Sequence, residues 1–393
     1  MGLSANLKRW VQHPYSLWVV FVLIAIVASV QGYMRLQKLV GNVVFTSYNN
    51  YLIFKHSFFH LIHHKDLYIL YPQEHWDLYK YSPAFSLLFG IFAILPDWLG
   101  LMGWNLLNTL SLLCAINLLP NVSFSTKQYI LLFVALELLT ATQNAQSNAL
   151  MAALLIFTFC YLERRQYGWA TLCIVASIYI KLFGLVAFAL FLFYPNKLRL
   201  VGYTLFWILT FALLPLLVVD AGQLQFLYQS WWKMLGNDHA ASYGLSVLGW
   251  LHSWFGYALS KSIPTLAGVF IFCLPLMYIR RYQQFFFRLL MCCSILLWVV
   301  IFNHKAESPT FIIAMCGVGI WYFTQPRSAL NTALVVSAFI FTSLSPTDLF
   351  PKILRENLVV PYVLKGVACI AVWCKIIFDL LSENYKISTS KNT

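Results

Sequence analysis

The chain has 393 residues, of which 61% are hydrophobic and only 10% are charged. Charged residues make up about a quarter of a typical soluble domain, so this composition excludes a soluble globular protein and indicates an all-α polytopic membrane protein. The formal net charge of +13 does not indicate a nucleic-acid partner, because the basic residues are scattered at the ends of apolar segments. There they set topology and contact anionic membrane lipids.

Taken in chain order, the apolar segments predict a bundle of about 12 transmembrane helices. A membrane span needs on the order of 20 residues, and fewer where helices are short or broken. We expect a single integral membrane domain over residues 1–382 and a short cytoplasmic tail over 383–393. The candidate spans are 15–33, 82–95, 99–119, 128–141, 147–162, 168–180, 183–194, 200–219, 264–280, 287–303, 309–323, 328–344 and 358–379.

Three short basic loops, at 163–165, 196–199 and 280–288, orient the bundle because such loops face the cytoplasm. This orientation predicts a protein of the cytoplasmic membrane with both termini inside. It also predicts long outer loops at about 34–81 and 220–263.

Two short segments need special treatment in this topology. The run 168–194 must form two short helices with Lys181 at their outer tip. Counting 82–95 and 99–119 as two full crossings would place the basic loop at 163–165 on the wrong face, so we expect one segment in this region not to cross.

The first outer loop is rich in ionisable residues. Its pattern over 50–64 predicts an amphipathic interfacial helix, with Tyr51 and Phe54 in an apolar stripe and the histidines turned toward a cavity. His56 and His60 are four positions apart, a spacing that suits a metal ion. Contacts with water and lipid headgroups are the simpler interpretation, so a divalent metal is not favoured and no cofactor is expected.

A general base for group transfer must be an acid on the outer face or a histidine. Few acids lie there by the predicted topology. They are Asp66, Glu74, Asp77, Asp220, Asp238, Glu307, Asp348 and Glu356.

Other polar residues fall on the same face. Lys181 is either a phosphate ligand or a lysine that snorkels to the interface. His304, Lys305 and Glu307 precede a Ser-Pro helix start and form either part of a phosphate site or a structural ion pair. Gln143 and Asn144 either hydrogen-bond sugar hydroxyls or only end their helices. Inside the spans, Glu137 is expected to bond a neighbouring helix and the nine cysteines to serve as packing residues.

The order and spacing of several short pieces resemble a known family of membrane enzymes. The pieces are Asn50-Tyr51 through Asp66-Leu67-Tyr68, Tyr81-Ser82-Pro83, Gln143-Asn144, Lys181, 237–246 and Glu307-Ser308-Pro309. They resemble glycosyltransferase family 87, in the GT-C superfamily, which includes polyprenol-phosphate-mannose-dependent mannosyltransferases. The resemblance implies a GT-C-like bundle that moves a hexose, with mannose favoured, from a polyprenyl-phosphate sugar to a lipid or glycan acceptor, with inversion.

The resemblance also implies roles for individual residues. The family's catalytic aspartate falls at Asn50, and an amide cannot accept a proton, so we favour Asp77 as the base, with Glu74 and Asp66 as alternatives. Lys181, His304 and Lys305 would stabilise the leaving phosphate, and Glu307 would orient one of the last two. The remaining candidates would contact the sugar or the acceptor: Lys80, Tyr81, Gln143, Asn144, His56 and His60.

Two other functions stay open at this point. A transporter or flippase of a lipid-linked sugar would use the same phosphate site and would explain the missing aspartate, although no internal repeat favours it. A subunit of an envelope-glycan assembly complex could retain the scaffold without the activity.

Overall fold

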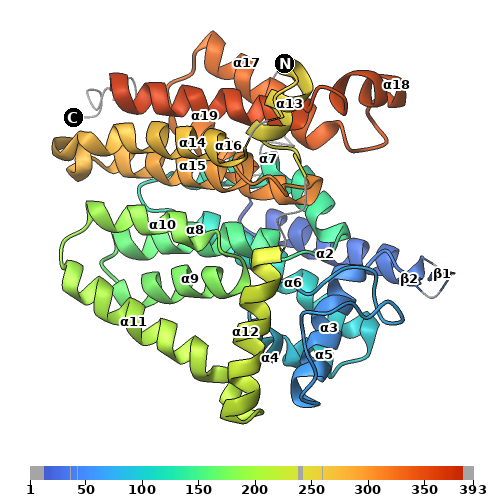
Figure 1. Cartoon of the computed structure of the whole chain (residues 1–393). Coiled ribbons are helices and arrows are strands. Elements are labelled where there is room, and N and C mark those ends of the chain that lie inside the picture. The colour runs from blue at the N-terminus through green and yellow to red at the C-terminus, as the bar shows by residue number, and fades with distance from the viewer. Residues whose placement is uncertain (1–12, 36, 42, 238–241, 259, 384–393) are drawn as a thin grey trace.

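The computed structural model describes residues 13–35, 37–41, 43–237, 242–258 and 260–383 (Figure 1). Asp238, most of the tail beyond 382 and the first residues of the chain therefore lie outside the described part. The helices are α2 (Ser16–Met34), α3 (Asn49–Ile62), α4 (Pro83–Leu88), α5 (Gly90–Ala93), α6 (Asp97–Asn117), α7 (Phe124–Gln143), α8 (Asn148–Glu163), α9 (Tyr167–Ile180), α10 (Gly184–Ala187), α11 (Lys197–Leu213), α12 (Ala221–Asn237), α13 (Val247–Phe255), α14 (Ser262–Cys273), α15 (Phe285–Ile301), α16 (Phe311–Thr324), α17 (Ala329–Ala338), α18 (Lys352–Leu354) and α19 (Leu364–Ser382). Strands β1 (Lys38–Val40) and β2 (Val43–Phe45) form a small antiparallel hairpin.

The fold is an all-α membrane bundle, as the composition predicts. Four helices in the described part are long and apolar enough to cross a membrane: α2, α6, α7 and the Lys197–Leu217 segment that begins with α11. Several shorter apolar helices pack beside them. The number of crossings, about 12, stays a prediction. In Figure 1 most long helices run side by side, α12 stands across them, and α3, α4, α5 and the hairpin gather at one end.

The segment 82–95 does not form a continuous span. Ser82 caps α4 by accepting a hydrogen bond from the backbone N–H of Phe85 (3.2 Å), and the helix ends at Leu88. As a straight helix, residues 83–93 would reach only about 16 Å, against about 30 Å of hydrocarbon. A segment here that does not cross the membrane agrees with the topology argued from the sequence, in which two full crossings would place the basic loop at 163–165 on the wrong face.

This short segment changes one assignment made from the sequence. Asp97 begins α6 and pairs with Lys55 of α3, so it lies with the first outer loop. The set of outer acids derived above omits Asp97, because 82–95 was counted there as a span.

Contacts between loops agree with the predicted grouping of loops into two faces, while the orientation of these faces stays a prediction. Among the loops predicted to lie outside, Trp231 Nε1 donates a hydrogen bond to the backbone oxygen of Lys80 (3.3 Å). Among those predicted to lie inside, the Arg288 guanidinium forks onto both carboxylate oxygens of Glu163 (2.5 and 2.9 Å). Loops that were assigned to the same face are therefore in contact with each other.

The run 168–194 forms the predicted pair of short helices. Lys181 adopts an extended backbone conformation that ends α9, and α10 begins three residues later and continues into a 3₁₀ turn. The turn is tight at Gly184, because a Cβ there would lie 2.1 Å from Ser177 Oγ and 2.6 Å from the backbone oxygen of Ile174. Lys181 is thus held between two packed helices.

A second core lies outside the main bundle, beneath the first outer loop. Phe54 of α3 packs edge-on against Phe85, Phe89 and Trp104, with ring centroids 5.2–5.7 Å apart. The helix predicted over 50–64 is confirmed as α3. Among its histidines, His60 is buried, at only 4% exposure; that the histidines turn toward a cavity stays a prediction.

A buried ion pair joins α7 to α19. Lys365 Nζ lies 2.9 Å from Glu137 Oε1 and also donates hydrogen bonds to Ser308 Oγ and to the backbone oxygen of Thr342, both at 2.9 Å. The prediction that Glu137 bonds a neighbouring helix is therefore confirmed. All nine cysteines are unpaired, and most are buried in the bundle.

Candidate functional site

The turn between α7 and α8, residues 143–148, contacts several of the residues predicted to form the site. Trp104 Nε1 anchors its middle by donating to the backbone oxygen of Ala145 (2.9 Å), and Ala145 has a left-handed φ of 50°. At the beginning of the turn, Asn50 Nδ2 donates to the backbone oxygen of Asn144 (2.9 Å). The first outer loop is thereby fastened to the bundle beside Gln143 and Asn144.

The end of the same turn holds a lysine and an acid. Lys181 Nζ donates to Asn148 Oδ1 (2.6 Å), and Gln146 Nε2 donates to Glu307 Oε2 (3.0 Å). Burial lowers the pKa of Lys181 to about 8; Glu307 acts in the opposite direction, and Lys80 lowers it further. The turn thus brings together Lys181 and Glu307, and Lys80 lies close enough to affect the charge of Lys181.

Asp77, Lys80 and Tyr81 lie beside this cluster. Asp77 Oδ1 is 3.5 Å from Lys80 Nζ, and its side chain is 41% exposed. Burial raises the pKa of Tyr81, a hydrogen bond with Ser147 lowers it, and the charges of Glu307 and Asp77 raise it, so the phenol is within electrostatic range of both acids. Lys181 Nζ is 6.0 Å from the centre of the Tyr81 ring. Asp77 therefore combines partial exposure with closeness to Lys80.

Glu74 is engaged with histidines of α3. Its Oε2 lies 2.8 Å from His60 Nε2 and 3.3 Å from His56 Nδ1. Burial lowers the pKa of His60 to about 4, with smaller contributions from Lys65, His75 and His63, so its imidazole is neutral near pH 7. Within the described part of the chain, no group of three or more potential ligands is arranged to hold a metal ion.

Asp66 fastens the first outer loop to α12. Ser230 Oγ contacts both of its carboxylate oxygens (2.8 and 2.9 Å), and the backbone N–H of Tyr68 donates to Oδ1 (3.0 Å). A separate pocket of about 280 Å³ opens beside it, lined also by Lys233 and Asn237. The hydrogen bonds of Asp66 are those of a structural carboxylate.

His304 and Lys305 lie in the turn that precedes the 3₁₀ turn Ser308–Thr310. The second outer loop closes on this turn, since Leu245 N–H donates to the backbone oxygen of Ala306 (2.9 Å). Gly244 has a left-handed φ of 53°, and a Cβ there would lie 2.5 Å from the backbone oxygen of His304. Only glycine fits this close approach.

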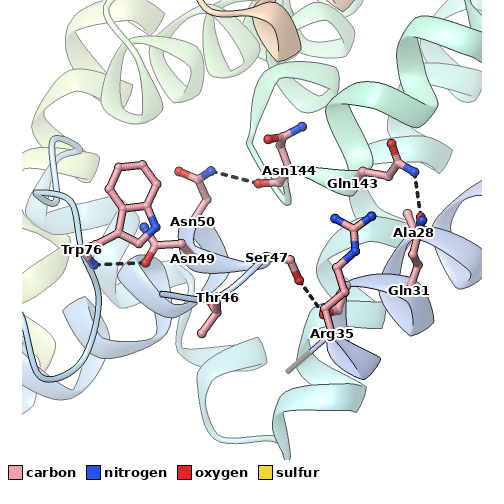
Figure 2. A pocket seen from close by; sticks show the side chains of 11 residues that line it. Ala28, Gln31, Arg35, Thr46, Ser47, Asn49, Asn50, Trp76, Gln143 and Asn144 are labelled. Atoms are coloured by element: carbon pink, nitrogen blue, oxygen red, sulfur yellow. Dashed lines mark hydrogen bonds between the residues drawn. The ribbon is translucent and has the colours of Figure 1, made fainter. Parts of the chain in front are cut away.

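A polar pocket of about 320 Å³ lies beside Asn50 (Figure 2). It joins the end of α2, the start of α3, the loop around Trp76 and the beginning of the 143–148 turn. Its lining residues are Ala28, Gln31, Gly32, Arg35, Thr46, Ser47, Asn49, Asn50, Trp76, Gln143 and Asn144. Sequence reasoning found three of them and missed Arg35 and Trp76; the available signal was a basic residue and a tryptophan at the two ends of the first outer loop.

Comparison with known protein families gives one match. The family model described as glycosyltransferase family 87 matches residues 79–302, which is more than half of the chain. The matched region begins just before Tyr81 and includes the 143–148 turn and Lys181. No curated protein matches the chain at a significant level.

Proposed function

The chain belongs to glycosyltransferase family 87, and from this premise we propose that it moves a hexose, with mannose favoured, from a polyprenyl-phosphate sugar to a lipid or glycan acceptor. The family makes it a membrane glycosyltransferase. The donor, the acceptor and the outer face of the cytoplasmic membrane as the place of reaction are parts of the proposal.

One observation carries the proposal: the 143–148 turn gathers Lys181 and Glu307, with Lys80 and Asp77 beside them. A polyprenyl phosphate that leaves a sugar needs positive charge where its own negative charge develops. A lysine held by Asn148 and partly withdrawn from water supplies this charge without reorganising. Lysine acts here as a point charge, which suits a monoester or diester phosphate.

The proposed reaction is a single displacement at the anomeric carbon. Asp77 accepts the proton of the acceptor hydroxyl, and the acceptor oxygen forms a bond to the anomeric carbon from the face opposite the phosphate. The bond from that carbon to the phosphate oxygen breaks, and the polyprenyl phosphate leaves with the electron pair. Lys181, with His304 and Lys305, stabilises the departing charge, and the sugar is inverted. Glu307 favours the charged form of Lys181.

Asp77 is the better base on structural grounds. Glu74 lies against His56 and His60, and Asp66 is bonded to Ser230, whereas Asp77 is partly exposed beside Lys80. Asn50 has an amide that is bonded to Asn144 and cannot act as a base.

The test is sugar transfer by the purified protein in lipid nanodiscs, with radiolabelled polyprenyl-phosphate sugars and a lipid extract as acceptor. Asp77→Asn should reduce transfer by at least about 100-fold, while the exposed Glu356→Gln should leave it unchanged. Transfer that survives in Asp77→Asn and disappears in Glu74→Gln or Asp66→Asn would move the base to that residue.

The resemblance assigns the family's aspartate to Asn50, and an amide there favours a second candidate: a protein that carries a lipid-linked sugar across the membrane. The same Lys181 site would hold its phosphate. Passage of labelled donor to the opposite leaflet of proteoliposomes, with no transfer to any acceptor, would support this candidate over the transferase.

A further inference from the structure

The pocket beside Asn50 is a built polar site that the donor chemistry above does not use. One polar atom of each amide side chain in the lining is hydrogen-bonded to another part of the protein. Gln143 Nε2 donates to Gln31 Oε1 (2.7 Å), and Asn50 Nδ2 donates to the Asn144 backbone. Asn49 Oδ1 accepts from Trp76 N–H, and Asn144 Nδ2 donates to the backbone of Thr140. Within the described part of the chain, the other amide atoms of these lining residues are two donors, Gln31 Nε2 and Asn49 Nδ2, and three acceptors, the side-chain oxygens of Gln143, Asn50 and Asn144. Alternating donors and acceptors of this kind match the hydroxyl groups of a sugar.

Trp76 gives the pocket an aromatic wall. Trp76 is 48% exposed, and its ring is stacked on Phe45 of β2, with centroids 6.3 Å apart and planes at 18°. Its backbone N–H donates to Asn49 Oδ1 (3.2 Å), which fixes the loop to the start of α3. A rigid, partly exposed indole next to amides can cover the apolar C–H face of a sugar ring.

Arg35 gives the pocket its charge. None of the eleven lining residues is acidic, and Arg35 is the charged one among them. In Figure 2 its guanidinium extends toward Gln143 and Asn144 rather than away from the pocket. A guanidinium pairs with the planar oxygens of a phosphate or carboxylate through two parallel hydrogen bonds. The pocket therefore favours an anionic ligand over a neutral one.

The size and position of the pocket restrict the ligand further. A volume of about 320 Å³ is at the lower end for small-molecule sites, so it suits one sugar ring with a small substituent. The 143–148 turn separates this pocket from Lys181: Gln143 and Asn144 line the pocket, and Asn148 holds the lysine. A transferase needs its two substrates side by side in this way.

We infer that this pocket is the acceptor subsite, and that it takes a hexose-sized ring that carries a phosphate or carboxylate held by Arg35. The inference rests on the proposed transferase function and names the chemical class of its acceptor. Trp76 covers the ring, the free amide atoms bind its hydroxyls, and Asp77, the next residue along the chain, reaches the hydroxyl that is glycosylated.

The test is binding of glucose 6-phosphate, glucuronate and glucose to the full-length protein in nanodiscs, measured by ligand-observed NMR titration up to millimolar concentrations. The two anionic sugars should bind at least about tenfold more tightly than glucose. This preference should fall below about twofold in Arg35→Gln and persist in Arg35→Lys. Trp76→Ala should weaken all three ligands.

Two controls identify the site. Lys181→Met removes the main cation of the proposed donor-phosphate site and should keep the preference. Lys38→Gln removes an exposed cation of β1 outside the pocket and should also keep it. Equal affinities in the wild type, no binding of either anion, or a preference that disappears with Lys181 and not with Arg35 would overturn the inference. Selective binding without sugar transfer in the wild type would refute the transferase and leave the pocket, whereas transfer without charge preference would do the reverse.

Discussion

Lys181 has the central role among the residues proposed to stabilise the leaving phosphate, and it has to stay positively charged although it is partly withdrawn from water. Lys181→Met should lower the rate of sugar transfer by about 100- to 1,000-fold, the range for removing one preorganised group that stabilises developing charge. Lys181→Arg should restore part of it. Rates are compared at saturating donor, and a Lys181→Met protein that transfers at the wild-type rate would remove the lysine from the mechanism.

The pH dependence of transfer follows from the same side chain. The pKa of Lys181 is about 8, and the charged form exists below it, so transfer should decline as the pH rises through about 8. Glu307 raises this pKa, so in Glu307→Gln the decline should begin at a lower pH. Lys80 lowers it, so in Lys80→Gln the decline should begin at a higher pH. Normalised pH–rate profiles of the three proteins give the order, and identical alkaline limbs would contradict it.

Some site residues could be predicted from the sequence and others could not. The place of Lys181 between two short helices was predictable, because a lone charge inside an apolar run is costly and has to lie at a break; its role stays a prediction. Arg35 and Trp76 could not be predicted, because arginine and tryptophan are common at membrane surfaces. They line one pocket only because the first outer loop folds back onto α2. The base stays a prediction, since the geometry favours Asp77 without showing a reaction.

At the scale of elements, the α9–α10 turn is tightly constrained, since Gly184 has no room for a side chain. Gly184→Ala would push a Cβ onto Ser177 Oγ and the Ile174 backbone oxygen, and the strain should cost about 1–3 kcal/mol and displace Lys181. The matched control is Gly202→Ala in α11, where nothing lies within 4 Å. Melting temperature in one detergent and transfer rate should both fall for Gly184→Ala only; equal melting temperatures would show that the turn adapts.

The broken helix α4–α5 shows what an apolar pattern alone misses. Residues 82–95 are apolar enough to be counted as a span, and only the charge rule at 163–165 argued against it. The structure adds the physical reasons: Pro83 and Ser82 start the helix, and Gly90 lies so close to Phe58 that a Cβ would meet its ring at 2.5 Å. Tertiary packing of this kind leaves little trace in hydropathy.

At the scale of the whole molecule, the Glu137–Lys365 pair ties the last helix to the first half of the bundle. Glu137→Leu or Lys365→Met alone would leave one buried charge unpaired and should destabilise the protein by about 3–5 kcal/mol. The double variant removes both charges and should recover most of the loss. Melting temperatures of the four proteins form a double-mutant cycle, and a double variant as unstable as the two single losses combined would contradict the pairing.

The sequence predicted that Glu137 had a partner but not which one. Lys365 lies near the start of an apolar segment, where a lysine usually reaches to the membrane surface. Only the packing of α19 against α15, α16 and α17 turns it inward, to 4% exposure.

The predicted topology makes a direct expectation about access from each side. In a variant whose exposed Cys273 and Cys374 are replaced by serine, Leu349→Cys should react with a membrane-impermeant maleimide on intact cells. Leu198→Cys should react only after the cells are opened. Both positions are more than 80% exposed, so failure to label cannot reflect burial within the protein. The reverse pattern would invert the orientation and place the Lys181 face in the cytoplasm.

The central claim is that sugar leaves a polyprenyl phosphate and arrives on an acceptor in one step. The most direct measurement is mass spectrometry of the lipids after purified protein in nanodiscs has been supplied with polyprenyl-phosphate mannose and acceptor lipid. The account predicts polyprenyl phosphate and glycosylated acceptor in equal amounts, both absent with Lys181→Met. Donor that remains intact while it crosses the bilayer, or polyprenyl phosphate formed without any glycosylated acceptor, would contradict it.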